Sequence, residues 1–160
     1  VGMPGAGKST VGILLAKLTG LRFVDTDLDI QVREEATLQE ILEQHDYRYL
    51  RQVEEDVLLN LRLDHALVST GGSVVYSAPS MARLKSLGPV IYLKTELATL
   101  EERVAAAPLR GIASDGEQSF AQVYAERTPL YERYADYILV TGDNTPQQVA
   151  TAALQLLPRN

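Results

Sequence analysis

The chain has 160 residues, of which 46% are hydrophobic and 22% charged, and these proportions are typical of one ordinary globular domain. It contains no cysteine, which excludes disulfides and thiolate metal sites and predicts a cytoplasmic location. A formal net charge of −6 argues against a nucleic-acid-binding protein, and no apolar run reaches the length of a membrane span.

The first nine residues contain the phosphate-binding pattern G-x-x-x-x-G-K-[ST], which extends from Gly2 to Ser9. Its glycines allow backbone N–H groups to surround an anion, Lys8 reaches the outer phosphates and the Ser9 hydroxyl is a ligand for Mg²⁺. We therefore predict a nucleoside triphosphate site, followed by a helix over Thr10–Thr19. Since such a loop ordinarily follows a buried strand and only Val1 precedes it here, we also expect a first strand before residue 1.

Helices and strands alternate along the rest of the chain. Strands are predicted over 21–24, 66–69, 90–93 and 137–140, and helices from residue 37, over 46–61, 77–88, 96–106, 119–127 and from residue 145 onward. This alternation predicts an α/β fold, a doubly wound parallel sheet flanked by helices. Residues 108–118 have no apolar periodicity and contain Arg110 and two glycines, which favours a mobile lid.

Polar residues follow three of the predicted strands, as Asp25-Thr26-Asp27, Thr70-Gly71-Gly72 and Lys94-Thr95. Ligands of doubly wound sheets bind at these strand ends. For Asp25 alone, an Asx turn is the structural alternative. The second carboxylate, Asp27, favours a functional pair, in which one acid lies near Mg²⁺ and the other accepts a proton from an attacking hydroxyl.

Three arginines are candidates for the positive charges that phosphoryl transfer requires. Arg51 lies on a predicted helix with Glu54 three residues later on the same face, Arg110 lies in the lid and Arg127 at the predicted end of a helix. Each also has an ordinary interpretation: a solvated helix arginine, a loop charge and a partner of C-terminal carbonyls, respectively.

Five segments, in this order and at these separations, resemble the shikimate kinases: G-M-P-G-A-G-K-S-T, F-V-D-T-D, L-R-Q-V-E-E, S-T-G-G and E-R-T-P-L-Y. The similarity extends over essentially the whole chain. It implies a single kinase domain over 1–160 of the nucleoside-monophosphate-kinase type, with a lid at about 108–118 and acceptor-binding helices at about 27–61. The implied activity is transfer of a phosphoryl group from ATP, with Mg²⁺, to a hydroxyl of shikimate in aromatic amino-acid biosynthesis.

The resemblance also implies roles for matching residues. Lys8, Asp27 and Arg110 would be catalytic, and Ser9 and Asp25 would hold Mg²⁺. Residues implied to hold ATP are Gly5, Ala6, Gly7, Lys8, Ser9, Thr10, Arg103 and Arg110. Residues implied to hold shikimate are Asp27, Arg51 (steadied by Glu54), Gly71, Gly72 and Arg127.

Three departures from the family pattern affect the acceptor, the lid and the adenine site. Ser73 replaces the third of three consecutive glycines, at a cost of about 1 kcal/mol if that position requires a positive φ. The lid reads Arg110-Gly111-Ile112 rather than Arg-Pro-Leu, and the stretch 140–146 matches loosely. Two alternatives therefore stay open: a kinase for another carboxylated polyol such as gluconate, or a non-catalytic nucleotide-binding regulatory protein. We expect a monomer with a small-molecule substrate, and neither a nucleic-acid nor a membrane partner.

Overall fold

The computed structural model describes residues 1–107, 112 and 114–158. Its strands are β1 (Arg22–Asp25), β2 (Ala66–Ser69), β3 (Ile91–Lys94) and β4 (Tyr137–Val140). Its helices are α1 (Lys8–Thr19), α2 (Thr26–Glu34), α3 (Leu38–Gln44), α4 (Tyr47–Asn60), the 3-10 helix η1 (Gly72–Tyr76), α5 (Ala78–Leu87), α6 (Leu97–Ala106), α7 (Phe120–Tyr134) and α8 (Pro146–Leu156).

The strands form two parallel pairs. β1 pairs with β2 so that Asp25 lies opposite Ser69, and β3 pairs with β4 so that Lys94 lies opposite Val140. The backbone of Val1 donates to the Ile91 carbonyl at 2.9 Å and accepts from the Leu93 N–H at 3.0 Å, which aligns the first residue with β3. The predicted parallel α/β architecture is thus confirmed, while the strand expected before residue 1 stays a prediction.

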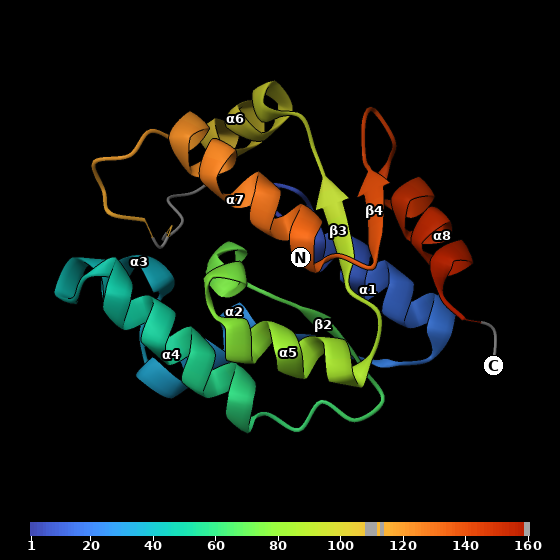
Figure 1. The fold of residues 1–160 in the computed structure, drawn as a ribbon, viewed down its shortest axis with the longest axis horizontal. Coiled ribbons are helices and arrows are strands. Elements are labelled where there is room, and N and C mark those ends of the chain that lie inside the picture. Colours follow the sequence, from blue (N-terminus) through green and yellow to red (C-terminus); the bar gives the residue numbers. More distant parts are fainter. Residues whose placement is uncertain (108–111, 113, 159–160) are drawn as a thin grey trace.

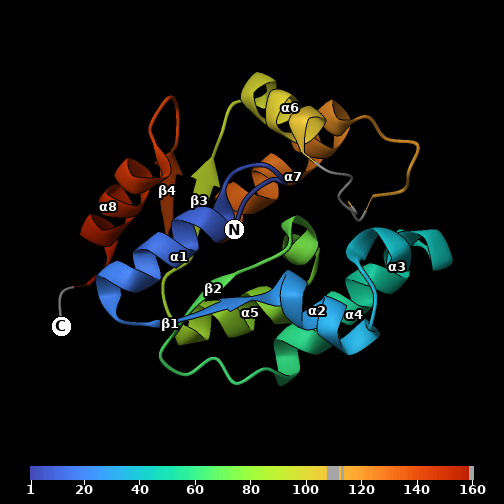
Figure 2. The same cartoon turned by 180° about the vertical axis from the view of Figure 1, so that it is seen from behind.

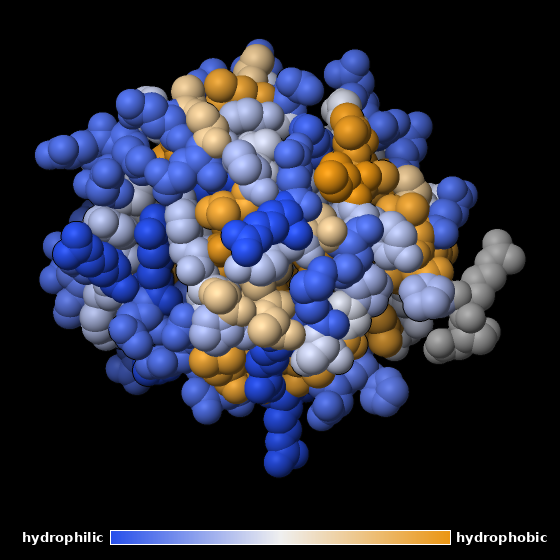
Figure 3. Space-filling view, in the orientation of Figure 1, coloured by the Kyte–Doolittle hydropathy of each residue, from blue (hydrophilic) through white to orange (hydrophobic). Residues whose placement is uncertain are grey.

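Helices cover both faces of the strands. Figures 1 and 2, seen from opposite sides, show α1 and α8 on one face and α5 and α7 on the other. Between them lies the main hydrophobic core, to which Leu15, Leu58, Met81, Tyr92 and Leu100 contribute buried side chains. The face of the molecule in Figure 3 is mostly hydrophilic, with apolar areas that include one near β4 and α8. In β4, the side chains of Ile138 and Val140 are exposed.

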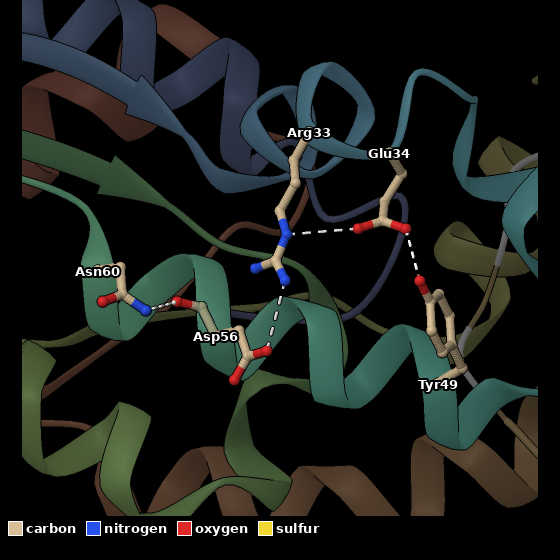
Figure 4. A network of polar contacts seen from close by, with 5 residues as sticks. All are labelled: Arg33, Glu34, Tyr49, Asp56 and Asn60. Carbon is tan, nitrogen blue, oxygen red and sulfur yellow. Dashed lines mark hydrogen bonds and ion pairs between the residues drawn. The ribbon is translucent and has the colours of Figure 1, made fainter.

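A second, smaller cluster lies beneath α2, α3 and α4 and consists of Ile30, Ile41, Leu50, Val53 and Val57. On the outside of the same helices, a polar network connects α2 with α4 (Figure 4). Arg33 contacts Glu34 at 3.4 Å and Asp56 at 3.5 Å, and the Tyr49 hydroxyl donates to Glu34 at 2.7 Å. The three helices therefore form a unit with its own packing at one end of the molecule.

Helix ends follow the sequence closely where a cap is present. The capping boxes at Thr37, Ser119 and Thr145 are all formed, and the Asp46 and Ser77 side chains cap α4 and α5. Among the described residues, no helix combines the length and the apolar composition that crossing a bilayer requires.

Three elements differ from the sequence prediction. The residue pattern did not predict helix α2, because only Thr26 and Ile30 of its nine residues are buried and its apolar signal is weak; only the resemblance implied helices from about residue 27. Helix α7 continues past Arg127 to Tyr134, with Pro129 inside it, so Arg127 lies in the middle of a helix rather than at its end. The 3-10 helix η1 occupies the segment that begins at the glycines.

Candidate functional site

A cavity of about 540 Å³ lies where the strands end, between the first loop and the unit formed by α2–α4. Most of the residues selected from the sequence line it together. These are Gly5, Gly7, Lys8, Ser9, Thr10, Asp25, Asp27, Gly71, Gly72, Arg103 and Arg127. Ala6 is buried beside them, and Arg110 lies outside the described residues.

The loop before α1 has the geometry of an anion cradle. Gly5 and Gly7 have φ of 85° and 86°, a conformation that L side chains rarely adopt. The Lys8 ammonium donates to the carbonyls of Gly2 and Met3, both at 2.9 Å. Burial, as the main cause, lowers the pKa of Lys8 to about 8, while the nearby Asp27 carboxylate opposes this change. Anionic phosphates in the loop would favour the charged lysine.

Ser9 and Asp25 lie in direct contact at the start of the crevice. The Ser9 hydroxyl donates to Asp25 Oδ2 at 2.5 Å, and Asp25 Oδ1 accepts the Asp27 N–H at 3.1 Å, which caps α2. The Asx-type role considered for Asp25 is therefore real, and the same carboxylate still presents an oxygen to Ser9. The described residues contain no group of three or more His, Asp or Glu side chains around one point.

A hydroxyl and one carboxylate fit Mg²⁺ in a nucleotide site, where the ion keeps several waters and binds phosphate oxygens rather than a full protein cage. Both donors are hard oxygen ligands, and they already lie within 2.5 Å of each other. The donor set therefore suits the ion that the sequence predicts.

The other end of the cavity is built around two glycines. A Cβ on Gly71 would overlap Glu54 Oε1 and lie 3.0 Å from Asp27 Oδ1. A Cβ on Gly72 would lie 2.9 Å from Arg127 Nη1. A side chain at either position would therefore displace the Glu54 carboxyl group or the Arg127 guanidinium from its place in the site.

Glu54 is a buried carboxyl group at this end, with 4% of its surface exposed. The Ser73 hydroxyl donates to its Oε2, and Oε1 faces Gly71 with no partner among the described residues. Burial is the main cause that raises the pKa of Glu54 to about 7; the Ser73 hydrogen bond opposes this, and Asp27 adds to it.

Ser73 does not carry the backbone cost considered from the sequence. It lies within η1 and is not among the residues with positive φ, so a side chain is accommodated without strain. Its hydroxyl instead binds Glu54, which no sequence pattern indicated.

The two acceptor arginines occupy different environments. Arg127 lines the cavity and is 1% exposed. Arg51 is not among the described residues that line it; its guanidinium stacks 3.8 Å from the Tyr76 ring centre and 4.8 Å from that of Tyr47. The Ser73 hydroxyl contacts Glu54, and two aromatic rings contact Arg51; that Glu54 steadies Arg51, as the resemblance implied, stays a prediction.

Arg103 extends from α6 toward the nucleotide end, where its Nη1 donates to the Gly5 carbonyl at 3.1 Å. Two tyrosines beside the acceptor arginines, Tyr47 and Tyr76, were missed by the sequence analysis, which named Ser73 but not its contact with Glu54. Lone tyrosines and serines carry no spacing signal, and only the position of Ser73 directly after two glycines pointed to this place.

The comparisons with known proteins agree over nearly the entire length. The family model described as shikimate kinase matches residues 4–158. The chain is 35% identical to shikimate kinase 2 of Yersinia pestis (strain Pestoides F), with 98% of this chain and 92% of that protein covered. It is 33% identical to shikimate kinase 2 of Enterobacter sp. (strain 638), with 94% and 89% covered.

Solved structures show the same fold. The shikimate kinase from Acinetobacter baumannii in complex with shikimate matches with a TM-score of 0.85 at 34% identity, with 97% of this chain and 88% of that one covered. The enzyme from Aquifex aeolicus matches with a TM-score of 0.80 at 25% identity, with 97% and 92% covered. These matches confirm the predicted doubly wound phosphate-loop fold.

Proposed function

The chain belongs to the shikimate kinase family, and we propose that it transfers the γ-phosphoryl group of ATP to a hydroxyl group of shikimate, with shikimate 3-phosphate and ADP as products. The observation that carries this proposal is a single cavity with two chemically distinct ends. One end has the phosphate loop and its lysine, and the other has two carboxyl groups and a buried arginine. Phosphoryl transfer requires donor and acceptor side by side, which such a cavity provides.

At the nucleotide end, the loop amides and Lys8 bind the ATP phosphates, and binding replaces the bonds that the ammonium makes to the Gly2 and Met3 carbonyls. Ser9 and Asp25 hold Mg²⁺, which when bound neutralises charge on the phosphate oxygens. Arg103 covers the nucleotide from α6. Arg110, in the lid, contributes a further cation in this proposal, although it lies outside the described residues.

At the acceptor end, Asp27 orients the attacking hydroxyl and accepts its proton. Its position in the first turn of α2, fixed by the Asp25 cap, supports this role. The backbone at Gly71 and Gly72 contacts the acceptor ring closely. Arg127 binds the acceptor carboxylate together with Arg51, a task for which a planar guanidinium is suited.

A coupled assay that measures ADP release with shikimate as acceptor tests the proposal. Asp27→Asn should lower kcat by at least a hundredfold and change the Kd for ATP by less than threefold. Asp29→Asn, two residues further along α2 and outside the described cavity lining, is the matched control and should keep full activity. No turnover of the unmodified chain at millimolar shikimate would refute the proposal.

The same assay separates the alternatives when gluconate and nucleoside monophosphates replace shikimate. Turnover of gluconate alone would identify a related polyol kinase, and ATP binding without any turnover would identify a regulatory protein. The monomeric state, the cytoplasmic location and the absence of nucleic-acid and membrane partners stay predictions, as does the mobile lid at about 108–118.

A further inference from the structure

Two arginine side chains converge on one aromatic ring beside the acceptor end of the cavity. The guanidinium carbon of Arg51 lies 3.8 Å from the centre of the Tyr76 ring, and that of Arg127 lies 5.4 Å from the same centre. Arg51 also has the Tyr47 ring at 4.8 Å. Two aromatic rings therefore contact Arg51, and Tyr76 contacts both cations.

The Tyr76 ring is itself fixed in place. It ends η1, whose preceding residues Ser73, Val74 and Val75 are buried. Its hydroxyl donates to Glu126 Oε1, and Glu126 Oε2 accepts from the Gln118 side chain at 3.0 Å. These two hydrogen bonds are the main causes that lower the pKa of Glu126, so an ionised carboxylate holds the ring at neutral pH.

The two aromatic rings reduce two free-energy costs of holding Arg51 and Arg127 close together. A long arginine side chain loses up to about 2 kcal/mol of rotamer entropy when it is ordered, and two nearby guanidinium groups repel each other. The negative face of an aromatic ring attracts each cation and restricts its position. The Glu126 carboxylate, next to Arg127 in sequence, offsets part of the positive charge.

We propose that Tyr76, assisted by Tyr47, is a positioning residue that holds the Arg51 guanidinium and sets its spacing from Arg127, so that both arginines bind one carboxylate group of the acceptor. The proposal rests on the proposed function, because it concerns recognition of that acceptor. It makes Tyr76 a determinant of affinity for carboxylated acceptors, while the nucleotide end is independent of it.

The test compares Tyr76→Leu and Tyr76→Phe in the coupled assay. Tyr76→Leu removes the ring face and should raise the KM for shikimate about tenfold, with the KM for ATP unchanged within twofold. Tyr76→Phe keeps the ring face and loses the hydrogen bond to Glu126, so its KM for shikimate should rise by no more than about threefold, less than in Tyr76→Leu. Equal defects in both variants, or a defect that falls on kcat or on the KM for ATP, would overturn the proposal.

A double-mutant cycle identifies Arg51 as the residue through which Tyr76 acts. In an Arg51→Ala background, Tyr76→Leu should change kcat/KM for shikimate by less than threefold, measured at low acceptor concentration. The same tenfold loss in that background would refute a role through Arg51. If Tyr76→Leu does not fold, Tyr47→Leu removes the other ring from a partly exposed position and should raise the KM about threefold.

Tyr49→Leu is the matched control. Tyr49 also donates its hydroxyl to a glutamate, Glu34, and stacks on a neighbouring side chain, the His45 ring, at 4.0 Å. It lies in the outer network of Figure 4 and should leave the KM for shikimate unchanged. An unmodified enzyme without activity on shikimate would refute the proposed function, whereas an active enzyme with a normal Tyr76→Leu variant would refute only this inference.

Discussion

Glu54 makes the stability of this protein depend on pH in an unusual direction. The pKa of its carboxyl group is raised from the ordinary value of 4.5 to about 7 in the folded protein, chiefly because the group is buried. Between these two values the folded state binds the proton more tightly than the unfolded state. Stability from this group is therefore fully present below pH 4.5 and is lost as the pH rises through 7.

The magnitude follows from the two pKa values. Each pH unit between 4.5 and 7 costs about 1.4 kcal/mol, so that the ionised Glu54 destabilises the fold by about 3 kcal/mol at pH 8. Glu54→Gln removes the charge and keeps an acceptor for the Ser73 hydroxyl, although a neutral acceptor loses about 1 kcal/mol of that hydrogen bond. We expect Glu54→Gln to be more stable by about 2 kcal/mol at pH 8.

Urea unfolding followed by far-ultraviolet circular dichroism measures this difference, since the chain has no tryptophan. The difference between variant and unmodified protein should shrink to less than about 1 kcal/mol at pH 4.5, where both side chains are neutral. Glu55→Gln is the control, because Glu55 also accepts a hydrogen bond from a serine, Ser77, but is only partly buried. A stability difference for Glu54→Gln that is constant from pH 4.5 to 8 would refute the reasoning.

Three further predictions concern other parts of the molecule. The pKa of Lys8 is lowered to about 8, and only the charged form binds phosphate, so kcat/KM for ATP should fall about tenfold per pH unit above 8. A constant kcat/KM up to about pH 9.5 would contradict this. Arg83 donates to the carbonyls of Leu59 and Leu61 at the end of α4, so Arg83→Met should cost about 2 kcal/mol in urea unfolding while kcat stays unchanged. Gly71→Ala should raise the KM for shikimate more than tenfold, because the new methyl group overlaps Glu54. The Kd for ATP, measured by calorimetry, should stay within threefold. A normal KM for shikimate would show that the backbone can shift.

The parts of the fold with strong local signals were predictable. The phosphate loop, the strands and the capping boxes each depend on residues close together in sequence, and the structure forms all of them. The cavity lining could be predicted because strand ends meet at one edge of a parallel sheet, so Asp25, Asp27, Gly71 and Gly72 had to converge.

The rest depends on contacts between distant segments. Ser73 and Glu54 are nineteen residues apart, and their hydrogen bond requires η1 to lie against α4. Tyr76 contacts Arg51 of α4 and Arg127 of α7, two residues far from it in sequence, so no local pattern could reveal either contact. The local pattern did not predict helix α2, because the helix is stabilised by the Asp25 cap and by one side chain, Ile30, in the small cluster.

That small cluster beneath α2, α3 and α4 has a consequence for how the molecule comes apart. Only Leu61 packs against both it and the main core among the described residues. Five aliphatic side chains stabilise less than the nineteen residues of the main core, and α2 and α3, unlike α4 with its Leu58, contribute no residue to that core; α2 and α3 therefore form the weaker cooperative unit. On warming, the backbone amides of these helices should exchange their hydrogens first, and the affinity for the acceptor should fall. The nucleotide loop should keep its structure at that temperature, because Met3 and Ala6 pack in the main core.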